Sequence, residues 1–279
     1  MASTSDIPSL EHTTHQYGEH SLQRVGVWQY ASSELSAPLT GYWIVFIHGG
    51  GWRDPRNTLY DFVPSSVRGF ASIDYRLSPH PDFPQDHTTT PATELRIAQH
   101  PDHLDDVRSA LSFLNAEYSI GGEYVLVGHS AGATLAYQLF MGGASVPLPV
   151  PAAIIGIAGI YDLIGLCVRK EGYDSFIGGA FGADQSTWDA ASPATFDGDF
   201  KTVLAANGSP PHLSILAASP EDTLIDMPET NLMAEKLAED DVNLTIVRSL
   251  DGEHDSIWED GSQIADLVIK ALAQLQQQA

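Results

Sequence analysis

A serine stands inside a glycine-flanked pentapeptide, Gly128-His129-Ser130-Ala131-Gly132, between an apolar run and a helical pattern. This G-x-S-x-G pattern, in a strand, turn and helix context, is typical of a sharp turn that presents a nucleophilic serine. Strand and helix approach closely there, so Gly128 and Gly132 satisfy a need for small residues. A helix cap would explain Ser130 but neither glycine. Ser130 is the predicted nucleophile, and His129 is expected to point away from it into the core.

A serine hydroxyl needs a base to take its proton, and the base needs a carboxylate to orient it. Behind a turn of this kind the acid follows the serine in the chain and the histidine comes last. Only His212 and His254 follow Ser130, and His212 stands at the start of an expected strand, the wrong end of the sheet. His254 is therefore the predicted base.

Three acids follow the expected strand Leu213–Ala218 at its carboxyl end: Glu221, Asp222 and Asp226. Asp222 is preferred, because it lies a few residues beyond the strand and the apolar pair Leu224-Ile225 can anchor the turn after it. The reading of Asp222 as a solvated or helix-leading acid stays open.

Glycines also follow the apolar run Trp43–Ile47, in the order His48-Gly49-Gly50-Gly51-Trp52. Backbone N–H groups in such a loop can face the negative charge that forms on a carbonyl oxygen during acyl transfer. Gly50 and Gly51 are the predicted donors, together with Ala131 after the nucleophile, and Gly49 makes the turn. His48 is expected to brace this loop through hydrogen bonds.

A metal site is not predicted from the remaining histidines. They lack the i, i+4 spacing of helical ligands and have no cysteine beside them; the loose cluster is His80, His87, His100 and His103. No cofactor is predicted either.

The elements that must position these residues alternate between short apolar runs and helical patterns, which favours a mostly parallel sheet with helices on both faces. The expected strands are Val25–Tyr30, Trp43–Ile47, Gly69–Asp74, Tyr124–Val127, Ala153–Ile157, Leu213–Ala218 and Leu244–Val247. The expected helices are Asp102–Ala116, Ala131–Met141, Pro228–Ala238 and Gln263–Gln276. Residues 172–211, rich in Gly, Ala, Ser and Pro, predict an irregular excursion, either a lid or a solvent-side insertion.

Length and charge limit the function further. The 279 residues suit one α/β domain, 1–279. A net charge of −23 disfavours nucleic acid and anionic membranes as partners, and no run is apolar enough for a membrane span. The one cysteine, Cys167, and the polar segment Met1–Gln23, which lacks signal-peptide features, predict a cytoplasmic protein.

Taken together, these residues resemble the α/β-hydrolase superfamily. The segment "DYRLSP" at Asp74–Pro79 and the glycine loop resemble carboxylesterases related to hormone-sensitive lipase. A narrower resemblance is to the fungal kynurenine formamidases, with their H-G-G-x-W motif. It rests on "IHGGGWRDPRNTLYDF" at Ile47–Phe62, "GHSAGA" at Gly128–Ala133 and "GIAGIYDL" at Gly156–Leu163.

The narrower resemblance implies a Ser130, Asp222 and His254 triad and an oxyanion hole that includes Gly50 and Gly51. Gly51 fills a place that is commonly Ala. It also implies hydrolysis of N-formyl-L-kynurenine to L-kynurenine and formate, in tryptophan breakdown toward kynurenine products or NAD.

The formyl group would need a tight acyl pocket and the aromatic ring an aromatic wall, for which Trp52 is the candidate. A broad carboxylesterase and a non-catalytic binding protein of the same fold remain as alternatives. Whether the chain forms a homodimer stays open.

Overall fold

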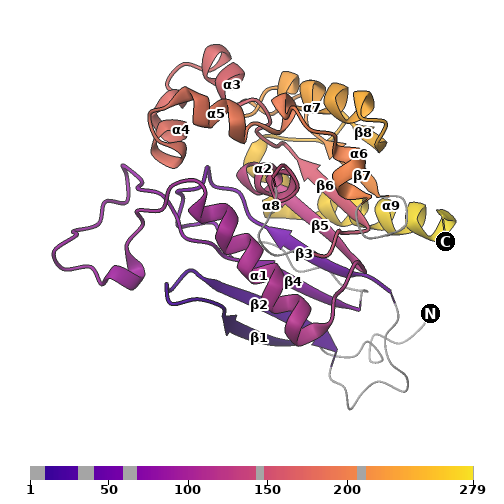
Figure 1. The fold of residues 1–279 in the computed structure, drawn as a ribbon, viewed down its shortest axis with the longest axis horizontal. Coiled ribbons are helices and arrows are strands. Elements are labelled where there is room, and N and C mark those ends of the chain that lie inside the picture. The colour runs from indigo at the N-terminus through magenta and orange to yellow at the C-terminus, as the bar shows by residue number, and fades with distance from the viewer. Residues whose placement is uncertain (1–9, 31–40, 59–67, 143–147, 206–211, 279) are drawn as a thin grey trace.

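The computed structural model describes residues 10–30, 41–58, 68–142, 148–205 and 212–278. Within these ranges an eight-stranded sheet forms the centre, in the order β1-β2-β4-β3-β5-β6-β7-β8 (Figure 1). The pairs from β4 to β8 are parallel, whereas β1 and β2 pair antiparallel at one edge. The strands are β1 (Leu10–Gln16), β2 (Arg24–Tyr30), β3 (Trp43–Ile47), β4 (Gly69–Ile73), β5 (Tyr124–His129), β6 (Ala153–Ile157), β7 (Leu213–Ala217) and β8 (Asn243–Val247).

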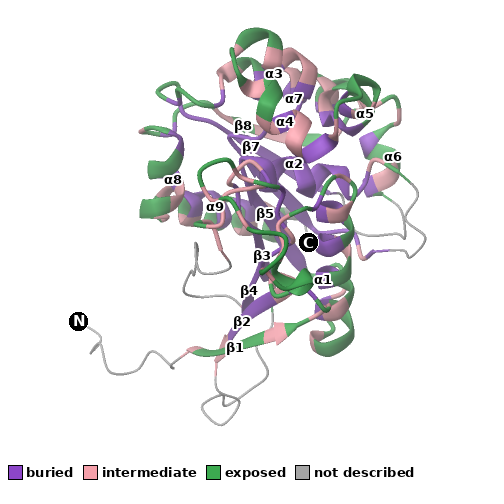
Figure 2. Cartoon of the chain, turned by 90° about the vertical axis from the view of Figure 1, so that its left-hand side faces the viewer, coloured by how far each residue is buried: buried purple, intermediate pink, exposed green. Residues whose placement is uncertain are grey.

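The sheet confirms the predicted α/β architecture. β3 and β6 have the predicted bounds, and the other predicted strands differ by one or two residues at an end. Every residue of β3 to β7 is buried, which explains their continuous apolar runs. β1 was not predicted, because it is a largely exposed edge strand with the polar sequence LEHTTHQ (Figure 2).

Helices cover both faces of the sheet, as predicted. Alternate residues of β3 enter two separate apolar clusters: Val45 belongs to the one that includes residues of α1, α2 and α7, and Phe46 to the one that includes residues of α9. The helices are α1 (Asp102–Tyr118), α2 (Ala131–Gln138), α3 (Leu163–Arg169), α4 (Tyr173–Phe181), α5 (Gln185–Ala191), α6 (Phe200–Leu204), α7 (Met227–Glu239), α8 (His254–Asp260) and α9 (Ser262–Gln278). None of the helices in the described ranges is both long and apolar enough to cross a membrane.

The predicted excursion forms short helices in the part that the structure describes, so the expectation that it is irregular is wrong. Residues 172–205 contain α4, α5 and α6; residues 206–211 lie outside the described part of the chain. The side chains of Asp184 and Asp199 cap α5 and α6. These helices have only five to nine residues, too few to give a clear period in a sequence rich in glycine and alanine.

Candidate active site

Ser130 occupies a strained turn between the end of β5 and the start of α2. Its φ and ψ are 52° and −122°, and its amide donates to the Ile157 carbonyl at 2.8 Å. A Cβ added at Gly128 would lie 2.6 Å from the Ala133 amide nitrogen, and one at Gly132 would lie 2.7 Å from the His48 carbonyl oxygen. Both positions therefore require glycine, because strand and helix approach closely there, as predicted. The turn holds Ser130 at the carboxyl edge of the sheet.

His254 and Asp222 come together from two loops that follow β7 and β8. Asp222 Oδ2 lies 2.7 Å from His254 Nδ1, and both side chains are buried. Asp222 Oδ1 accepts hydrogen bonds from the amides of Leu224 and Ile225, at 2.9 and 2.8 Å. A carboxylate only accepts, so His254 Nδ1 carries a proton and Nε2 is left as the basic nitrogen.

The other two acids considered from the sequence do not contact His254. Glu221 is exposed and accepts the amide of Gly252 at 2.9 Å. Asp226 forms an ion pair with Arg169 at 2.8 Å. Asp222 alone of the three is placed to orient the base.

The glycine loop after β3 turns back against the Ser130 turn. Gly50 and Gly51 have φ values of 91° and 54°, and the Gly50 carbonyl accepts the amide of Asp54 at 2.9 Å. Among the described residues no acceptor is recorded for the amides of Gly50, Gly51 or Ala131. Unpaired amides beside a nucleophile can stabilise an oxyanion, which is the role predicted for these three residues.

His48 and Tyr75 hold this loop from beneath. His48 Nδ1 lies 2.9 Å from the Gly49 carbonyl oxygen, and the imidazole stacks on the Tyr75 ring at 4.6 Å. The Tyr75 hydroxyl lies 3.1 Å from the His48 carbonyl and 3.2 Å from that of Gly49, close enough to donate to either. The contacts of His48 agree with the bracing role expected for it.

His129, expected to be a packed core residue, is buried and also touches the predicted base. Its ring centroid lies 4.6 Å from that of His254. Burial, and secondarily the charge of His254, lower the pKa of His129 well below its ordinary value. The neutral ring of His129 therefore supports His254 by packing without adding a second positive charge.

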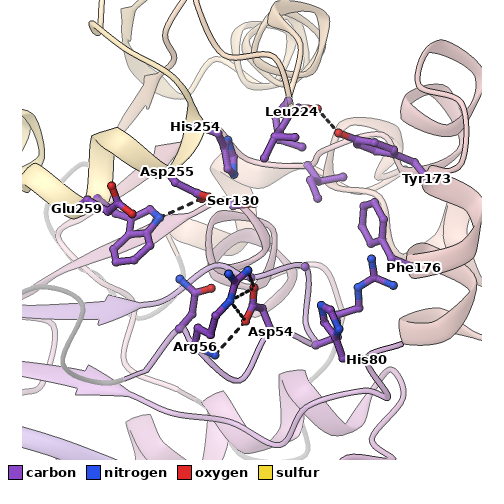
Figure 3. A pocket seen from close by; sticks show the side chains of 17 residues that line it. Asp54, Arg56, His80, Ser130, Tyr173, Phe176, Leu224, His254, Asp255 and Glu259 are labelled. Carbon is purple, nitrogen blue, oxygen red and sulfur yellow. Dashed lines mark hydrogen bonds and ion pairs between the residues drawn. The ribbon is translucent and has the colours of Figure 1, made fainter. Parts of the chain in front are cut away.

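The Ser130 turn opens into a cavity of about 460 Å³ (Figure 3). Gly50, Gly51, Ser130 and His254 line its floor. Apolar walls come from Ile160, Tyr173, Phe176, Leu224, Ile225 and Trp258. Charged residues add to the lining: Arg53, Asp54, Arg56, Asp255 and Glu259. This volume and lining suit a small aromatic ligand with polar substituents.

Trp52 does not form the aromatic wall, so that prediction is wrong. The side chain is completely buried and is absent from the cavity lining. Its ring packs edge-on against Phe181 at 4.8 Å and lies 6.5 Å from the ring of Phe176. Trp52 supports Phe176 from behind, and Phe176 with Tyr173, both on α4, faces the cavity instead. Both lie in residues 172–211, for which the sequence predicted no regular element and no site residue.

The described residues contain no group of three His, Cys, Asp or Glu side chains that could hold a metal ion. The loose histidine cluster is dispersed in the fold. His80 lines the cavity, His100 stacks on Phe181, and His103 is buried beside the hydroxyl of Ser78. Burial lowers the pKa of His103 to about 3.

The chain is similar to known α/β hydrolases over most of its length. The model of the alpha/beta hydrolase family matches residues 44–268. The kynurenine formamidase-like hydrolase fscH of Fusarium equiseti is 35% identical, over 98% of this chain and 95% of its own length. The kynurenine formamidase avaC of Aspergillus versicolor is 33% identical, over 91% and 95%. The kynurenine formamidase of Meyerozyma guilliermondii is 31% identical, over 92% of each chain.

Solved structures share the fold at lower identity. The hormone-sensitive lipase homologue EstE7 from a metagenome library superposes with a TM-score of 0.68 at 17% identity, covering 96% of this chain and 89% of its own. Esterase B from Lactobacillus rhamnosis, in an inhibited form, gives a TM-score of 0.67 at 16% identity, covering 98% and 89%. These likenesses establish the architecture of the sheet and its helices.

Proposed function

The chain belongs to the kynurenine formamidase family of α/β-hydrolases and is an amide-hydrolysing enzyme, and we propose from this that its substrate is N-formyl-L-kynurenine, cleaved to L-kynurenine and formate. The observation that carries the proposal is the set of relatives named for this activity, 31% to 35% identical over more than nine-tenths of the chain. The arrangement of Ser130, His254 and Asp222 beside an aromatic-walled cavity supports it.

In the first half of the proposed reaction the hydroxyl of Ser130 attacks the formyl carbon. His254 Nε2 takes the hydroxyl proton, and Asp222 stabilises the imidazolium that forms. The carbonyl oxygen becomes an oxyanion, which the amides of Gly50, Gly51 and Ala131 stabilise. Each such donor typically contributes about 3 to 4 kcal/mol to transition-state stabilisation.

In the second half the bond between the formyl carbon and the arylamine nitrogen breaks. His254 returns its proton to the departing nitrogen, so that L-kynurenine leaves as a neutral arylamine and the formyl group stays esterified to Ser130. Water, deprotonated by His254, then attacks the formyl carbon of the formyl-serine. The bond to Ser130 Oγ breaks, His254 returns the proton to this oxygen, and formic acid leaves and ionises to formate. No cofactor is required at any step, because the residues of the triad carry every proton.

The cavity supports an aromatic substrate better than a long acyl chain. Phe176 and Tyr173 offer ring faces and edges, with their centroids 5.1 Å apart. Leu224 and Ile225 also line the cavity, and Leu224 lies beside His254 (Figure 3). An aryl ring packed there would present its ortho formamide to Ser130. A broad carboxylesterase, the alternative raised by the sequence, shares the triad but has no need of these walls.

The deciding measurement is kcat/KM on N-formyl-L-kynurenine and on p-nitrophenyl acetate with the same enzyme preparation. The ratio of these two values measures the specificity of the enzyme. We expect the formamide to be preferred, because its whole leaving group would pack against the aromatic walls. The Ser130→Ala protein, expected to fold and to lose turnover on both substrates, serves as the blank. Preference for the ester would overturn the proposed substrate.

A further inference from the structure

We infer that Arg53 binds the α-carboxylate of the substrate, so that the cavity selects an aryl formamide with an anionic amino-acid end over one without it. The inference rests on the proposed function and assigns the part of the substrate that Ser130, His254 and Asp222 do not touch. Four observations carry it: the position of Arg53, its missing partner, the charges around it, and the opposite wall.

Arg53 is fixed relative to the reaction centre by the glycine loop. It lines the cavity, and its amide donates to the Gly50 carbonyl at 3.1 Å. Its guanidinium carbon lies 5.3 Å from the centroid of the Phe176 ring, on the aromatic wall. A guanidinium in this position can reach a group attached to a ring that packs against Phe176.

The Arg53 guanidinium has no hydrogen bond or ion pair with any described residue, unlike its neighbour. Arg56, three positions on, binds Asp54 through two nitrogens, with Nη2 at 2.6 Å and Nε at 3.1 Å from Oδ2. Burial lowers the pKa of Arg53 from its ordinary value, and the nearby Asp82 and Asp54 oppose this. An arginine remains protonated in proteins. Arg53 is therefore a partly buried cation with five donors available, the geometry that matches a carboxylate.

Among the described residues that line the aromatic side of the cavity, Arg53 is the cation without a hydrogen-bonded partner. The carboxylate of Asp54 is neutralised by Arg56. Burial, and next the charge of Arg53, lower the pKa of His80, so this ring is neutral at pH 7. Asp82 is also nearby but forms no ion pair with Arg53 in the described part of the chain, so a carboxylate approaching Phe176 meets a guanidinium with free donors.

The side of the cavity opposite Phe176 carries negative charge. Asp255 and Glu259, both on α8, lie across the cavity from Phe176 and His80 (Figure 3). They would repel a substrate carboxylate and attract an ammonium group. An α-amino acid end carries both groups on one carbon, so these two walls orient it with its carboxylate toward Arg53 and its ammonium toward α8.

The test compares N-formyl-L-kynurenine with N-formylkynuramine, which keeps the aryl formamide and the amino group but has hydrogen in place of the carboxylate. We expect the wild-type enzyme to favour the carboxylated substrate by about tenfold or more in kcat/KM, as a charged hydrogen bond of ordinary strength would give. Arg53→Gln should lose at least about tenfold more on N-formyl-L-kynurenine than on N-formylkynuramine. The loss should fall mainly on KM, because the contact is equal in ground and transition states. Arg53→Lys should retain part of the preference.

Arg68→Gln is the control, because it also removes an arginine charge, but one that is paired with Glu123 and lies outside the cavity lining. Any loss in this variant should be equal for the two formamides. Thermal unfolding of each variant shows whether a loss of activity reflects folding. Equal hydrolysis of both formamides by the wild type, or equal losses in Arg53→Gln, would overturn the assignment of Arg53 alone. Absence of hydrolysis of either formamide, with ester hydrolysis intact, would overturn the proposed function and this inference with it.

Discussion

At the scale of single residues, Asp222 shows how one carboxylate serves two purposes. Oδ1 accepts two backbone amides and so fixes the loop, while Oδ2 accepts from His254. The side chain is fully buried, which strengthens each of these charged hydrogen bonds. The carboxylate can thus hold the imidazole in one tautomer as well as in one orientation.

The Asp222→Asn variant is expected to lose roughly 10³- to 10⁴-fold in kcat while remaining folded. The amide oxygen can still accept from Leu224 and Ile225, but the new NH₂ group would face His254 Nδ1. His254 would then carry its proton on Nε2, where it cannot accept one from Ser130. Steady-state kinetics and circular dichroism measure the two effects.

Asp226→Asn is the control, because Asp226 lies on the same segment and binds Arg169 instead of the base. This variant is expected to keep the wild-type kcat/KM. A similar loss in both variants would mean that the orienting acid has been assigned to the wrong residue.

At the scale of elements, the site depends on how closely β3, β5 and α2 approach one another. Gly132 in α2 lies against the carbonyl groups that end β3, and Gly49 lies against the side chain of Ser130. The oxyanion loop and the nucleophile turn are therefore one packed unit, built from segments about 80 residues apart in the sequence.

Gly132→Ala is expected to destabilise the protein by about 1 to 3 kcal/mol or more, and to lower kcat. The added methyl group would collide with the backbone oxygens of Ile47 and His48, and backbone cannot move aside as a side chain can. Urea unfolding measures the change in free energy.

Gly179→Ala in α4 supplies the contrast, because an added Cβ there would meet no atom within 4 Å. That variant should be about 0.5 to 1 kcal/mol more stable than the wild type, as alanine favours a helix over glycine. A stability loss in Gly179→Ala equal to that in Gly132→Ala would contradict the steric argument.

At the scale of the whole molecule, a buried carboxylate links α7 to the segment after β6. Glu229 is completely buried, accepts the amide of Asp162 at 2.8 Å and contacts Arg169 of α3. Burial is the largest influence and raises the pKa of Glu229 to about 7, although the amides and Arg169 favour its ionised form.

Glu229 is therefore expected to make the free energy of unfolding fall as pH rises. The folded protein keeps this proton up to about pH 7, while the unfolded chain releases it near its ordinary value of 4.5. The contribution of this proton to the free energy of unfolding is at most about 3 kcal/mol. It is complete below pH 4.5 and is lost as the pH rises through about 7.

The measurement is the stability difference between wild type and Glu229→Gln across this pH window, in which most other titrating groups cancel. As pH rises, the wild type should lose stability relative to Glu229→Gln. A difference independent of pH would show that Glu229 is ionised throughout.

Features that depend on short stretches of chain could be predicted from the sequence. Strands β3 and β6 could be predicted to the residue, because a strand buried on both faces is a continuous apolar run. The turn around Ser130 was equally visible, because close packing leaves room only for glycine at set positions. His254 followed from its place in the chain order.

The contacts between distant side chains, in contrast, depend on the complete fold. Trp52 looked like an aromatic wall, yet it is buried behind Phe176, and His129 rests against His254. The short helices of the excursion and the polar edge strand β1 have no strong pattern of their own. Their stability comes from contacts with other elements, and a contact between distant segments depends on packing that no local pattern records.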